Sequence, residues 1–152
     1  MKQSELNRVL DQHKLWLESN GNKGKRADLF GADLTGTYLS GADLSGVNLT
    51  DASLSYANLA DANLTDANLT GADLSGAYLS GANLTGANLT NANLFRAYLK
   101  FANLSGADLS DSILNSKQMF NAKVNHSQLS WLATDPNFCD WVDKLDMKKE
   151  AA

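Results

Sequence analysis

The sequence has very few of the residues that define redox, metal-binding or membrane proteins. It contains one cysteine, one proline and two histidines among 152 residues. The lone Cys139 cannot form an intramolecular disulfide, which agrees with a reducing compartment. No apolar run is long enough to cross a bilayer, and the N-terminus has no signal-peptide pattern. The net charge of −4 argues against a basic surface for nucleic acid or lipid. We therefore expect a cytoplasmic protein that binds neither nucleic acid nor membrane directly.

Residue patterns that carry catalysis are also missing. His13, His126 and Cys139 do not have metal-ligand spacing, and no serine lies in the sequence context of a nucleophile elbow. The glycines recur at regular positions rather than in a phosphate-binding loop. The aspartates are spread along the chain, whereas paired catalytic carboxylates need a recess that shifts their pKa values. We expect no enzyme activity, no catalytic residue, no cofactor and no metal ion.

What the sequence has in abundance is a repeat of five residues. Leucine occupies every fifth position from Leu29 to Leu114, and Met119, Val124 and Leu129 continue the series. A small residue, usually alanine, stands two positions earlier, and Asp or Asn usually lies between the two. Five residues advance an α-helix by about 140° beyond a full turn, so the leucines would spread around it. In a continuous strand, an odd period would send successive leucines to opposite faces.

Three extended residues followed by a corner satisfy this repeat. In Ala-Asp-Leu, alanine and leucine then point inward and the polar residue points outward. Two residues such as Ser45-Gly46 turn the chain, with glycine supplying a positive φ. Roughly four corners close a square, and stacked squares pair as short parallel strands about 4.8 Å apart. The repeats over 27–131 are predicted to form about five coils, stabilised mainly by an internal column of leucines.

Two segments carry a resemblance to a known family. The segments Ala42-Asp43-Leu44-Ser45-Gly46 and Ala82-Asn83-Leu84-Thr85-Gly86 resemble the A-(D/N)-L-x-x motif of the pentapeptide-repeat family. This family is abundant in cyanobacteria and other bacteria. The resemblance implies an all-β fold, a right-handed quadrilateral parallel β-helix, without a cofactor. A right-handed coil also agrees with the general preference of parallel crossovers.

Residues 1–26 are predicted to cap the first coil with a short α-helix, because a solenoid leaves an open edge at each end. Ser4 is the expected N-cap of this helix and Gly21 its expected stop. The His13 side chain is interpreted as part of the core rather than as a ligand. The apolar stripe at helical spacing, with an adjacent tryptophan, consists of Leu6, Val9, Leu10, His13, Trp16 and Leu17.

Residues 132–152 are predicted to form a second helical cap over the last coil. The repeat motif decays from Ser112 onward. Asp135 is the expected N-cap, with Pro136 in the first turn. At either end, the alternative is that the apolar stripe docks a second protomer, but we favour a monomer over a homodimer. The stripe of this second helix consists of Phe138, Trp141, Val142 and Leu145.

One outward column of the predicted coil is rich in tyrosine. Residues twenty apart should stack, and the segment 95–101 departs most from the repeat. Tyrosine and arginine are enriched at binding hot spots, and exposed apolar clusters often mark interfaces. The alternative is that the tyrosines pair across parallel strands and need no partner. The column consists of Tyr38, Asn58, Tyr78, Tyr98 and Gln118, and the candidate partner-binding residues are Tyr38, Tyr56, Tyr78, Phe95, Arg96, Tyr98, Lys100 and Phe101.

The function favoured by the sequence is a non-catalytic structural or protein–protein interaction module whose partner is another protein. The alternative is a DNA mimic, because some pentapeptide-repeat proteins resemble a DNA duplex in size and charge and bind DNA gyrase. Residues 27–131 hold nine Asp against four Lys or Arg. However, these aspartates are predicted to lie on all four faces, and no column has Asp in adjacent coils. This scatter disfavours the mimic.

Overall fold

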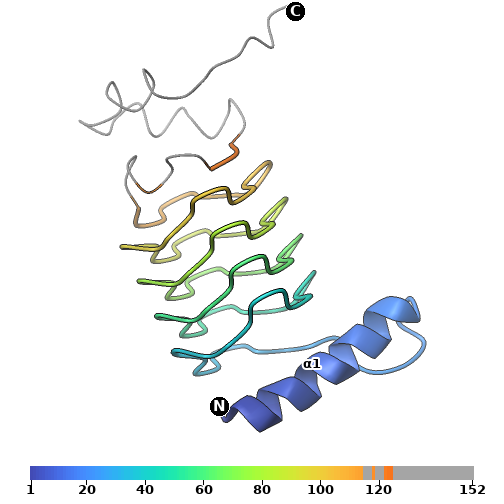
Figure 1. Cartoon of the computed structure of the whole chain (residues 1–152). Coiled ribbons are helices and arrows are strands. Elements are labelled where there is room, and N and C mark those ends of the chain that lie inside the picture. Colours follow the sequence, from blue (N-terminus) through green and yellow to red (C-terminus); the bar gives the residue numbers. More distant parts are fainter. Residues whose placement is uncertain (115–117, 119–121, 125–152) are drawn as a thin grey trace, which may run out of the picture.

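The computed structural model describes residues 1–114, 118 and 122–124. Figure 1 shows one helix at one end of a stack of coils. Parallel bridges join residues twenty positions apart, from Asp28–Asn48 to Asn103–Lys123, so that four repeats make one coil. The prediction of a parallel solenoid is therefore confirmed. Each described repeat contributes one bridged residue rather than the expected three-residue strand, because a corner begins directly after each leucine.

Every corner of the described coils is a tight turn. The N–H of Val47, for example, donates to the carbonyl of Leu44 over 3.1 Å and closes a β-turn. Gly46, the third residue of this turn, has φ +63°, as a type II turn requires. Asp61 adopts φ +58° at an equivalent corner, because a short polar side chain tolerates the left-handed region better than other side chains do.

Where the outward residue of a repeat is Asp or Asn, its side chain closes the corner that follows. Asn68 Oδ1 accepts hydrogen bonds from the N–H of Thr70 at 3.1 Å and from its hydroxyl at 2.7 Å. Asp73 Oδ1 accepts the N–H of Ser75 at 3.0 Å in the same way. Asp and Asn are the residues that form such side-chain turns. The hydrogen bond to the corner N–H explains why Asp and Asn are preferred between the alanine and the leucine of each repeat. The sequence alone identified this position only as outward and polar.

The core is the predicted column of leucines with the alanines beside it. From Leu29 to Leu109, every leucine of the repeat is at most 4% exposed. Leu114 and Val124 are partly buried and pack against the same cluster. Alanine occupies the remaining inward position and is also buried throughout the central coils. The assignment of inside and outside made from the sequence is confirmed.

Helix α1, Gln3–Glu18, lies beneath the first coil. Its N-cap is Lys2, so the prediction of Ser4 as the N-cap was wrong. The carbonyl of Lys2 already accepts the N–H groups of Glu5 and Leu6, both at 3.0 Å, which starts the helix at Gln3. The side chain of Gln3 bonds to the backbone of Tyr38 and so holds Gln3 in the first turn.

The end of α1 lies close to the predicted position. Asn20 takes the left-handed conformation at φ +50°. Gly21 then donates its N–H to the carbonyl of Trp16 at 2.8 Å, which completes a Schellman motif. Gly21, with φ +86°, therefore takes part in the stop as predicted, and Asn20 is the first residue with a positive φ after the helix.

Side chains of α1 pair with the open backbone edge of the first coil. The Gln3 amide donates to the carbonyl of Tyr38 at 3.2 Å and accepts its N–H at 3.1 Å, as a neighbouring peptide would. His13 is completely buried. Its Nδ1 accepts the N–H of Ala27 at 3.2 Å, so Nε2 carries the proton that it shares with the carbonyl of Ser45 at 3.1 Å. These contacts satisfy backbone N–H and C=O groups of the first coil that have no preceding coil to pair with. His13 is part of the core, as predicted.

Acid is expected to loosen this end of the protein. Burial lowers the pKa of His13 below its ordinary value of 6.5, outweighing the Ser45 carbonyl and Asp43, which raise it, while Arg26 adds to the lowering. The neutral ring is therefore favoured in the folded state. Its contribution to stability is complete above pH 6.5 and is lost as the pH falls from 6.5 through the lower folded pKa. Hydrogen exchange of the α1 amides should accelerate over this window relative to the amides of the central coils.

A His13→Gln variant is the matched control for this pH dependence. Glutamine can replace both bonds of the neutral imidazole, with its NH2 group as donor and its carbonyl oxygen as acceptor, but it does not titrate near neutral pH. The exchange of its α1 amides, corrected for intrinsic chemistry, should not change between pH 7.5 and 5.5. If both proteins show the same acceleration, His13 is not the titrating group.

Several predictions concern residues outside those that the structure describes. They are the C-terminal cap over 132–152 and the boundary of the repeats at 131, and Cys139 and His126 also lie outside the described residues. The other residues named in the sequence analysis that lie outside the described ranges are Met119, Leu129, Asp135, Pro136, Phe138, Trp141, Val142 and Leu145.

Candidate functional site

Three tyrosines and one asparagine stack along one side of the coils. Parallel bridges join Tyr38 to Asn58, Asn58 to Tyr78 and Tyr78 to Tyr98, as the spacing of twenty predicts. The rings of Tyr78 and Tyr98 are parallel within 2°, with centroids 5.0 Å apart, a favourable distance for stacked aromatic rings. We call this column, together with the side chains of its two flanking corners, the tyrosine face. Its corner members are Tyr56, Phe95, Arg96, Lys100 and Phe101.

Tyr56 lies at a corner beside the column, and its ring packs over a glycine of the next coil. The backbone of Tyr56 is left-handed, with φ +58°. A Cβ placed on Gly76 would lie 2.6 Å from Cε1 of Tyr56, which is closer than real contacts allow. Gly76 therefore makes room for this ring. The sequence signal for this role is that Gly76 stands twenty positions after Tyr56, but the sequence analysis did not use it.

The two cations of the tyrosine face lie against aromatic rings. The guanidinium of Arg96 is 5.0 Å from the ring centre of Phe95, and the ammonium of Lys100 is 5.0 Å from that of Phe101. Neither cation forms an ion pair within the described part of the chain. Residues 27–114 contain nine Asp and no other Lys or Arg. The positive charge of these coils is thus concentrated on the tyrosine face.

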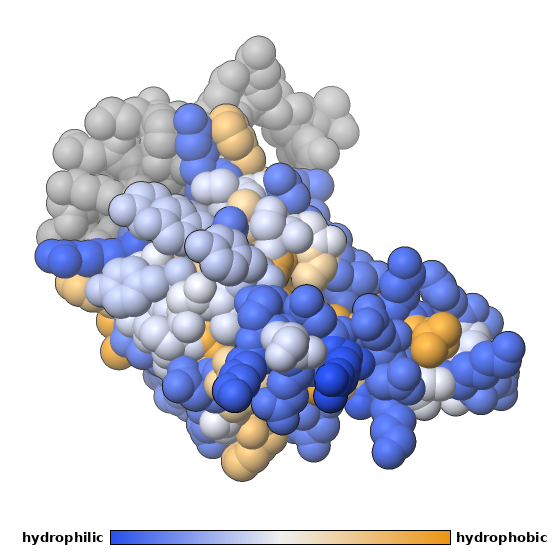
Figure 2. All heavy atoms as spheres, turned by 60° about the horizontal axis from the view of Figure 1, so that its bottom comes forward, coloured by the Kyte–Doolittle hydropathy of each residue, from blue (hydrophilic) through white to orange (hydrophobic). Residues whose placement is uncertain are grey.

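The aromatic side chains of the tyrosine face are exposed to solvent. Tyr38 is 76% exposed, Phe101 is 65% exposed and Tyr78, between its neighbours, is 47% exposed. None of the four tyrosine hydroxyls forms a hydrogen bond with another described residue. Figure 2 shows a pale patch of intermediate hydropathy on the coils, next to a strongly hydrophilic surface. Among the described residues of the coils, Phe30 is the only exposed aromatic residue outside the tyrosine face.

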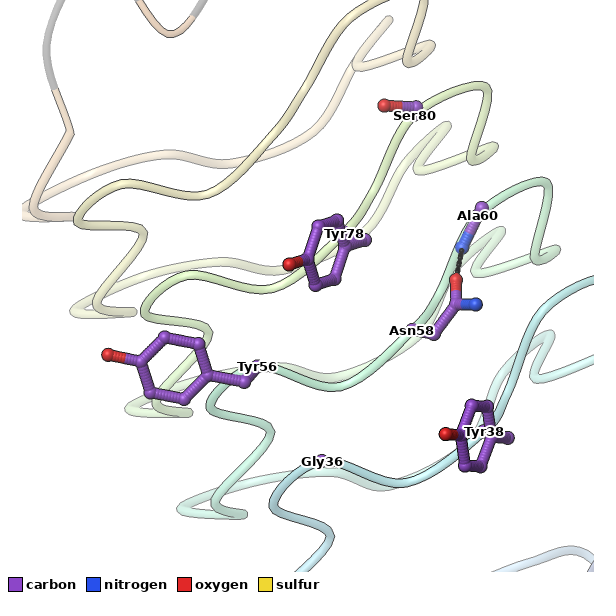
Figure 3. A pocket seen from close by; sticks show the side chains of 7 residues that line it. All are labelled: Gly36, Tyr38, Tyr56, Asn58, Ala60, Tyr78 and Ser80. Atoms are coloured by element: carbon purple, nitrogen blue, oxygen red, sulfur yellow. Dashed lines mark hydrogen bonds between the residues drawn. The ribbon is translucent and has the colours of Figure 1, made fainter.

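Two adjoining hollows lie on the tyrosine face. The larger, of about 360 Å³, has Tyr38, Tyr56 and Tyr78 around Asn58 (Figure 3). The smaller, of about 270 Å³, is lined by Tyr56, Gly76, Tyr78, Phe95, Arg96 and Tyr98 among others. Lys100 and Phe101 line neither hollow and lie at the opposite corner of the column. Six of the eight candidate residues are thus brought together, and Asn58 is a central residue that the sequence analysis did not select.

The last member of the predicted column has a different environment. The side-chain amide of Gln118 donates to the carbonyl of Leu94 and, at 3.4 Å, to that of Ala97. The tyrosine face is therefore defined here only up to Tyr98 and its corners.

Aromatic rings, phenol hydroxyls, one amide and two cations face solvent together. In the part of the chain that the structure describes, no group of three His, Cys, Asp or Glu side chains could hold a metal ion. The one described helix does not have the length and apolar character needed to cross a membrane.

Comparison with known proteins identifies the repeat. The sequence profile of the family described as pentapeptide repeats matches residues 27–66, 57–94 and 92–116, in eight copies. No curated protein sequence matches the chain significantly.

Solved structures of similar proteins come from cyanobacteria and other sources. A pentapeptide repeat protein from Nostoc Pcc 7120 is 34% identical with a TM-score of 0.58, over 66% of this chain and 83% of that one. Rfr23, a pentapeptide repeat protein from Cyanothece 51142, is 38% identical with a TM-score of 0.47, over 70% of this chain and 65% of that one. QnrB1, a plasmid-mediated fluoroquinolone resistance protein, is 22% identical with a TM-score of 0.37, over 70% of this chain and 62% of that one. The last two resemblances are too weak to carry an argument about function.

Proposed function

The chain belongs to the pentapeptide repeat family, and from this premise we propose that it is a non-catalytic module that binds another protein through the tyrosine face. The observation that carries the proposal is the concentration of exposed aromatic side chains and unpaired cations on one side of an otherwise polar, acidic rod. Exposed aromatic and arginine side chains supply most of the energy at protein interfaces.

The architecture supports such a role. Leucines that are fully buried in every central coil and backbone bonds between all successive coils hold the surface in one shape. A rigid surface loses little conformational entropy when it docks a partner. The ring of Tyr56 is seated over Gly76, and the rings of Tyr78 and Tyr98 support each other. The binding groups are thus held in position before a partner arrives.

The proposal includes the organisation expected from the sequence. Residues 1–26 and 132–152 form terminal caps, and residues 27–131 form a right-handed coil of about five turns. The protein acts in the cytoplasm as a monomer, without a cofactor and without direct contact with nucleic acid or membrane.

The DNA-mimic alternative has less support. A mimic needs carboxylates in rows that imitate phosphate spacing, but Asp28, Asp43 and Asp108 face the same sides of the coil as neutral asparagines. Asp43 and Asp108 also accept hydrogen bonds from the corner N–H two residues on, so they help to fold the chain. Acidic residues therefore serve the corners in this protein and do not form a continuous charged face.

The test is a comparative pull-down from a lysate of the source organism, read by mass spectrometry. The bait is the wild-type protein beside a variant with four substitutions on the tyrosine face. A matched control variant carries substitutions of exposed residues elsewhere. The first variant combines Tyr78→Ala, Arg96→Ala, Tyr98→Ala and Phe101→Ala, and the control combines Arg8→Ala, Lys14→Ala, Phe30→Ala and Ile113→Ala, which are exposed residues that close no corner.

We expect a protein that the wild type and the control retain and that the tyrosine-face variant loses, at matched thermal stability. Equal retention by all three baits would contradict the proposal. The tyrosines would then serve only to pair adjacent coils. If the captured protein were a DNA gyrase subunit, the DNA-mimic alternative would replace the proposed function.

A further inference from the structure

The tyrosine column has one missing ring. Tyr78 and Tyr98 occupy adjacent coils and stack 5.0 Å apart, whereas Asn58 separates Tyr38 from Tyr78. Adjacent coils are about 4.8 Å apart, so the coils of Tyr38 and Tyr78 are separated by roughly two such steps. One planar group inserted between these rings would have a neighbour at stacking distance on each side. We call the hollow around Asn58 the notch.

The notch has aromatic walls and a polar floor. Figure 3 shows the rings of Tyr38 and Tyr78 on either side of Asn58, with Tyr56 at the flanking corner. Gly36, at the same corner in the first coil, has no side chain, and a Cβ on it would meet nothing within 4 Å. The notch is therefore open to an incoming side chain.

Asn58 presents a hydrogen-bond donor to the notch. Its Oδ1 accepts the N–H of Ala60 at 3.1 Å, which leaves Nδ2 at the other end of the amide. Among the asparagines of other columns, Nδ2 of Asn68 makes no bond with a described residue, whereas Nδ2 of Asn63 donates to Asp43 of the preceding coil. Asn58 has Tyr38 in that place and makes no Nδ2 bond with any described residue. A ligand with an acceptor atom at its tip would satisfy this donor.

The second hollow supplies a cation beside the notch. Arg96 shares this hollow with Tyr56 and Tyr78, which also line the notch. Its guanidinium has no carboxylate partner among the described residues. Arg96 and Lys100 are the only cations of residues 27–114, and the described Lys123 belongs to another column, where it is bridged to Asn103. Arg96 is thus a cation beside the notch with which an acidic partner can pair.

We propose that the notch receives a tyrosine side chain of an acidic partner peptide, inserted between Tyr38 and Tyr78. The peptide hydroxyl accepts a hydrogen bond from Asn58 Nδ2, and an acidic side chain of the same peptide pairs with Arg96. Arg96 lies two coils beyond Asn58, or roughly 10 Å along the rod. An extended chain spans that distance in about three residues. This inference rests on the proposed function and specifies the partner.

Two other occupants fit less well. An arginine side chain is planar, but it would present donors to the Asn58 donor. A second copy of this chain could approach across a twofold axis. With Tyr78 of the second copy in the notch, Tyr98 of the second copy would lie at the level of this chain's own Tyr38. Placing Tyr98 of the second copy in the notch would instead bring Tyr78 of the second copy to the level of this chain's own Tyr78. In both of these registers the column of a second copy collides with this one, whereas a peptide with a single aromatic residue does not. A register with Tyr38 of the second copy in the notch avoids this collision, so a dimer of this chain in solution that buries the notch is an outcome that would overturn the inference.

The probe is the acetylated peptide Gly-Ser-Tyr-Ser-Ser-Glu-Ser-Gly, titrated into the ¹⁵N-labelled full chain. NMR detects binding in the millimolar range through the side-chain amide of Asn58. We expect saturable shifts of this amide. Replacing the peptide tyrosine with alanine should weaken binding about tenfold or more. Replacing its glutamate with glutamine should weaken binding by up to about fivefold, as for an exposed ion pair.

An Asn58→Tyr variant separates the notch from the rest of the tyrosine face. It completes the column and fills the gap while leaving Tyr38, Tyr56 and Tyr78 in place. Its matched control is Asn68→Tyr, at the equivalent strand position of another column, where Asn68 Oδ1 likewise accepts a corner N–H at 3.1 Å. Because the first variant lacks the Asn58 amide, binding to both variants is followed through the backbone amides of Tyr38 and Tyr78. We expect the first variant to lose peptide binding and the second to bind as the wild type does.

The outcomes distinguish this inference from the proposed function. Loss of the native partner in pull-downs with Asn58→Tyr, but not with Asn68→Tyr, supports the notch. If Asn58→Tyr retains a partner that the variant with four tyrosine-face substitutions loses, the tyrosine face binds a partner but the notch does not. That result overturns this inference and leaves the proposed function standing. Absence of peptide shifts at millimolar concentration, equal binding of the alanine peptide, or tighter binding of a peptide with arginine in place of tyrosine also overturns it.

Discussion

Replacing Leu74 with alanine should lower the free energy of unfolding by about 2–5 kcal/mol. Leu74 is completely buried in the third coil. The repeat places Leu54 and Leu94 above and below it, and both are also completely buried. Backbone bonds to both neighbouring coils prevent the coil from collapsing onto the empty space, as with Leu74 N–H to the Asn93 carbonyl at 2.8 Å. Urea denaturation followed by circular dichroism measures the loss.

Thr70→Ala, in the same coil, is the control for this cost. The side chain of Thr70 is half-buried on the outside, where its hydroxyl donates to Asn68 Oδ1 at 2.7 Å. Loss of one such bond should cost about 0.5–1.5 kcal/mol. A cost for Thr70→Ala equal to that for Leu74→Ala would contradict the assignment of leucine to the inside and threonine to the outside.

His13→Ala should destabilise the capped end by about 2–4 kcal/mol, because two buried backbone groups lose their partner at once. Those groups are the N–H of Ala27 and the carbonyl of Ser45. The ring of Trp16 also loses its stacked neighbour, whose centroid lies 5.8 Å away. Hydrogen exchange should show the largest increase in α1 and the first coil, with little change in the third coil.

The neighbouring Lys14→Ala is the matched control within α1. Its side chain is 71% exposed and its nitrogen lies 3.8 Å from the carboxylate of Glu18. An exposed pair of this kind contributes less than about 1 kcal/mol. If His13→Ala and Lys14→Ala changed the exchange of α1 equally, the cap would not depend on the buried imidazole.

Most of the solenoid could be predicted because its repeat has only one physical solution. A period of five is incompatible with a helix stripe and with a flat strand, so every leucine reports the same inward direction. The prediction of α1 was less accurate at its start. Ser4 is a good N-cap by type, but the Gln3 side chain pairs with Tyr38, 35 residues further on. A contact of that range outweighs a local preference and is not visible in the local pattern.

The tyrosine face could be predicted only as a list of residues. The spacing of twenty correctly placed Tyr78 beside Tyr98, because both belong to one column. The missing ring at Asn58 is visible in the same column, but an asparagine there looks like any other repeat residue. Its Nδ2 has no bond to a described residue, as is also true of Asn68, and what distinguishes Asn58 is its place between Tyr38 and Tyr78. Whether the tyrosine face binds a partner remains a prediction for the experiments above.

The sequence by itself determined the coil, its inside and outside, and the vertical neighbours of each side chain, because a period of five combined with four corners leaves no other register. Only the tertiary structure decided how the ends and the surface were completed. It matched the Gln3 and His13 side chains of α1 to an open backbone edge, seated Tyr56 over Gly76, and opened the notch between Tyr38 and Tyr78. These features depend on shape and on hydrogen-bond geometry between residues far apart in the chain, which residue type and spacing do not contain.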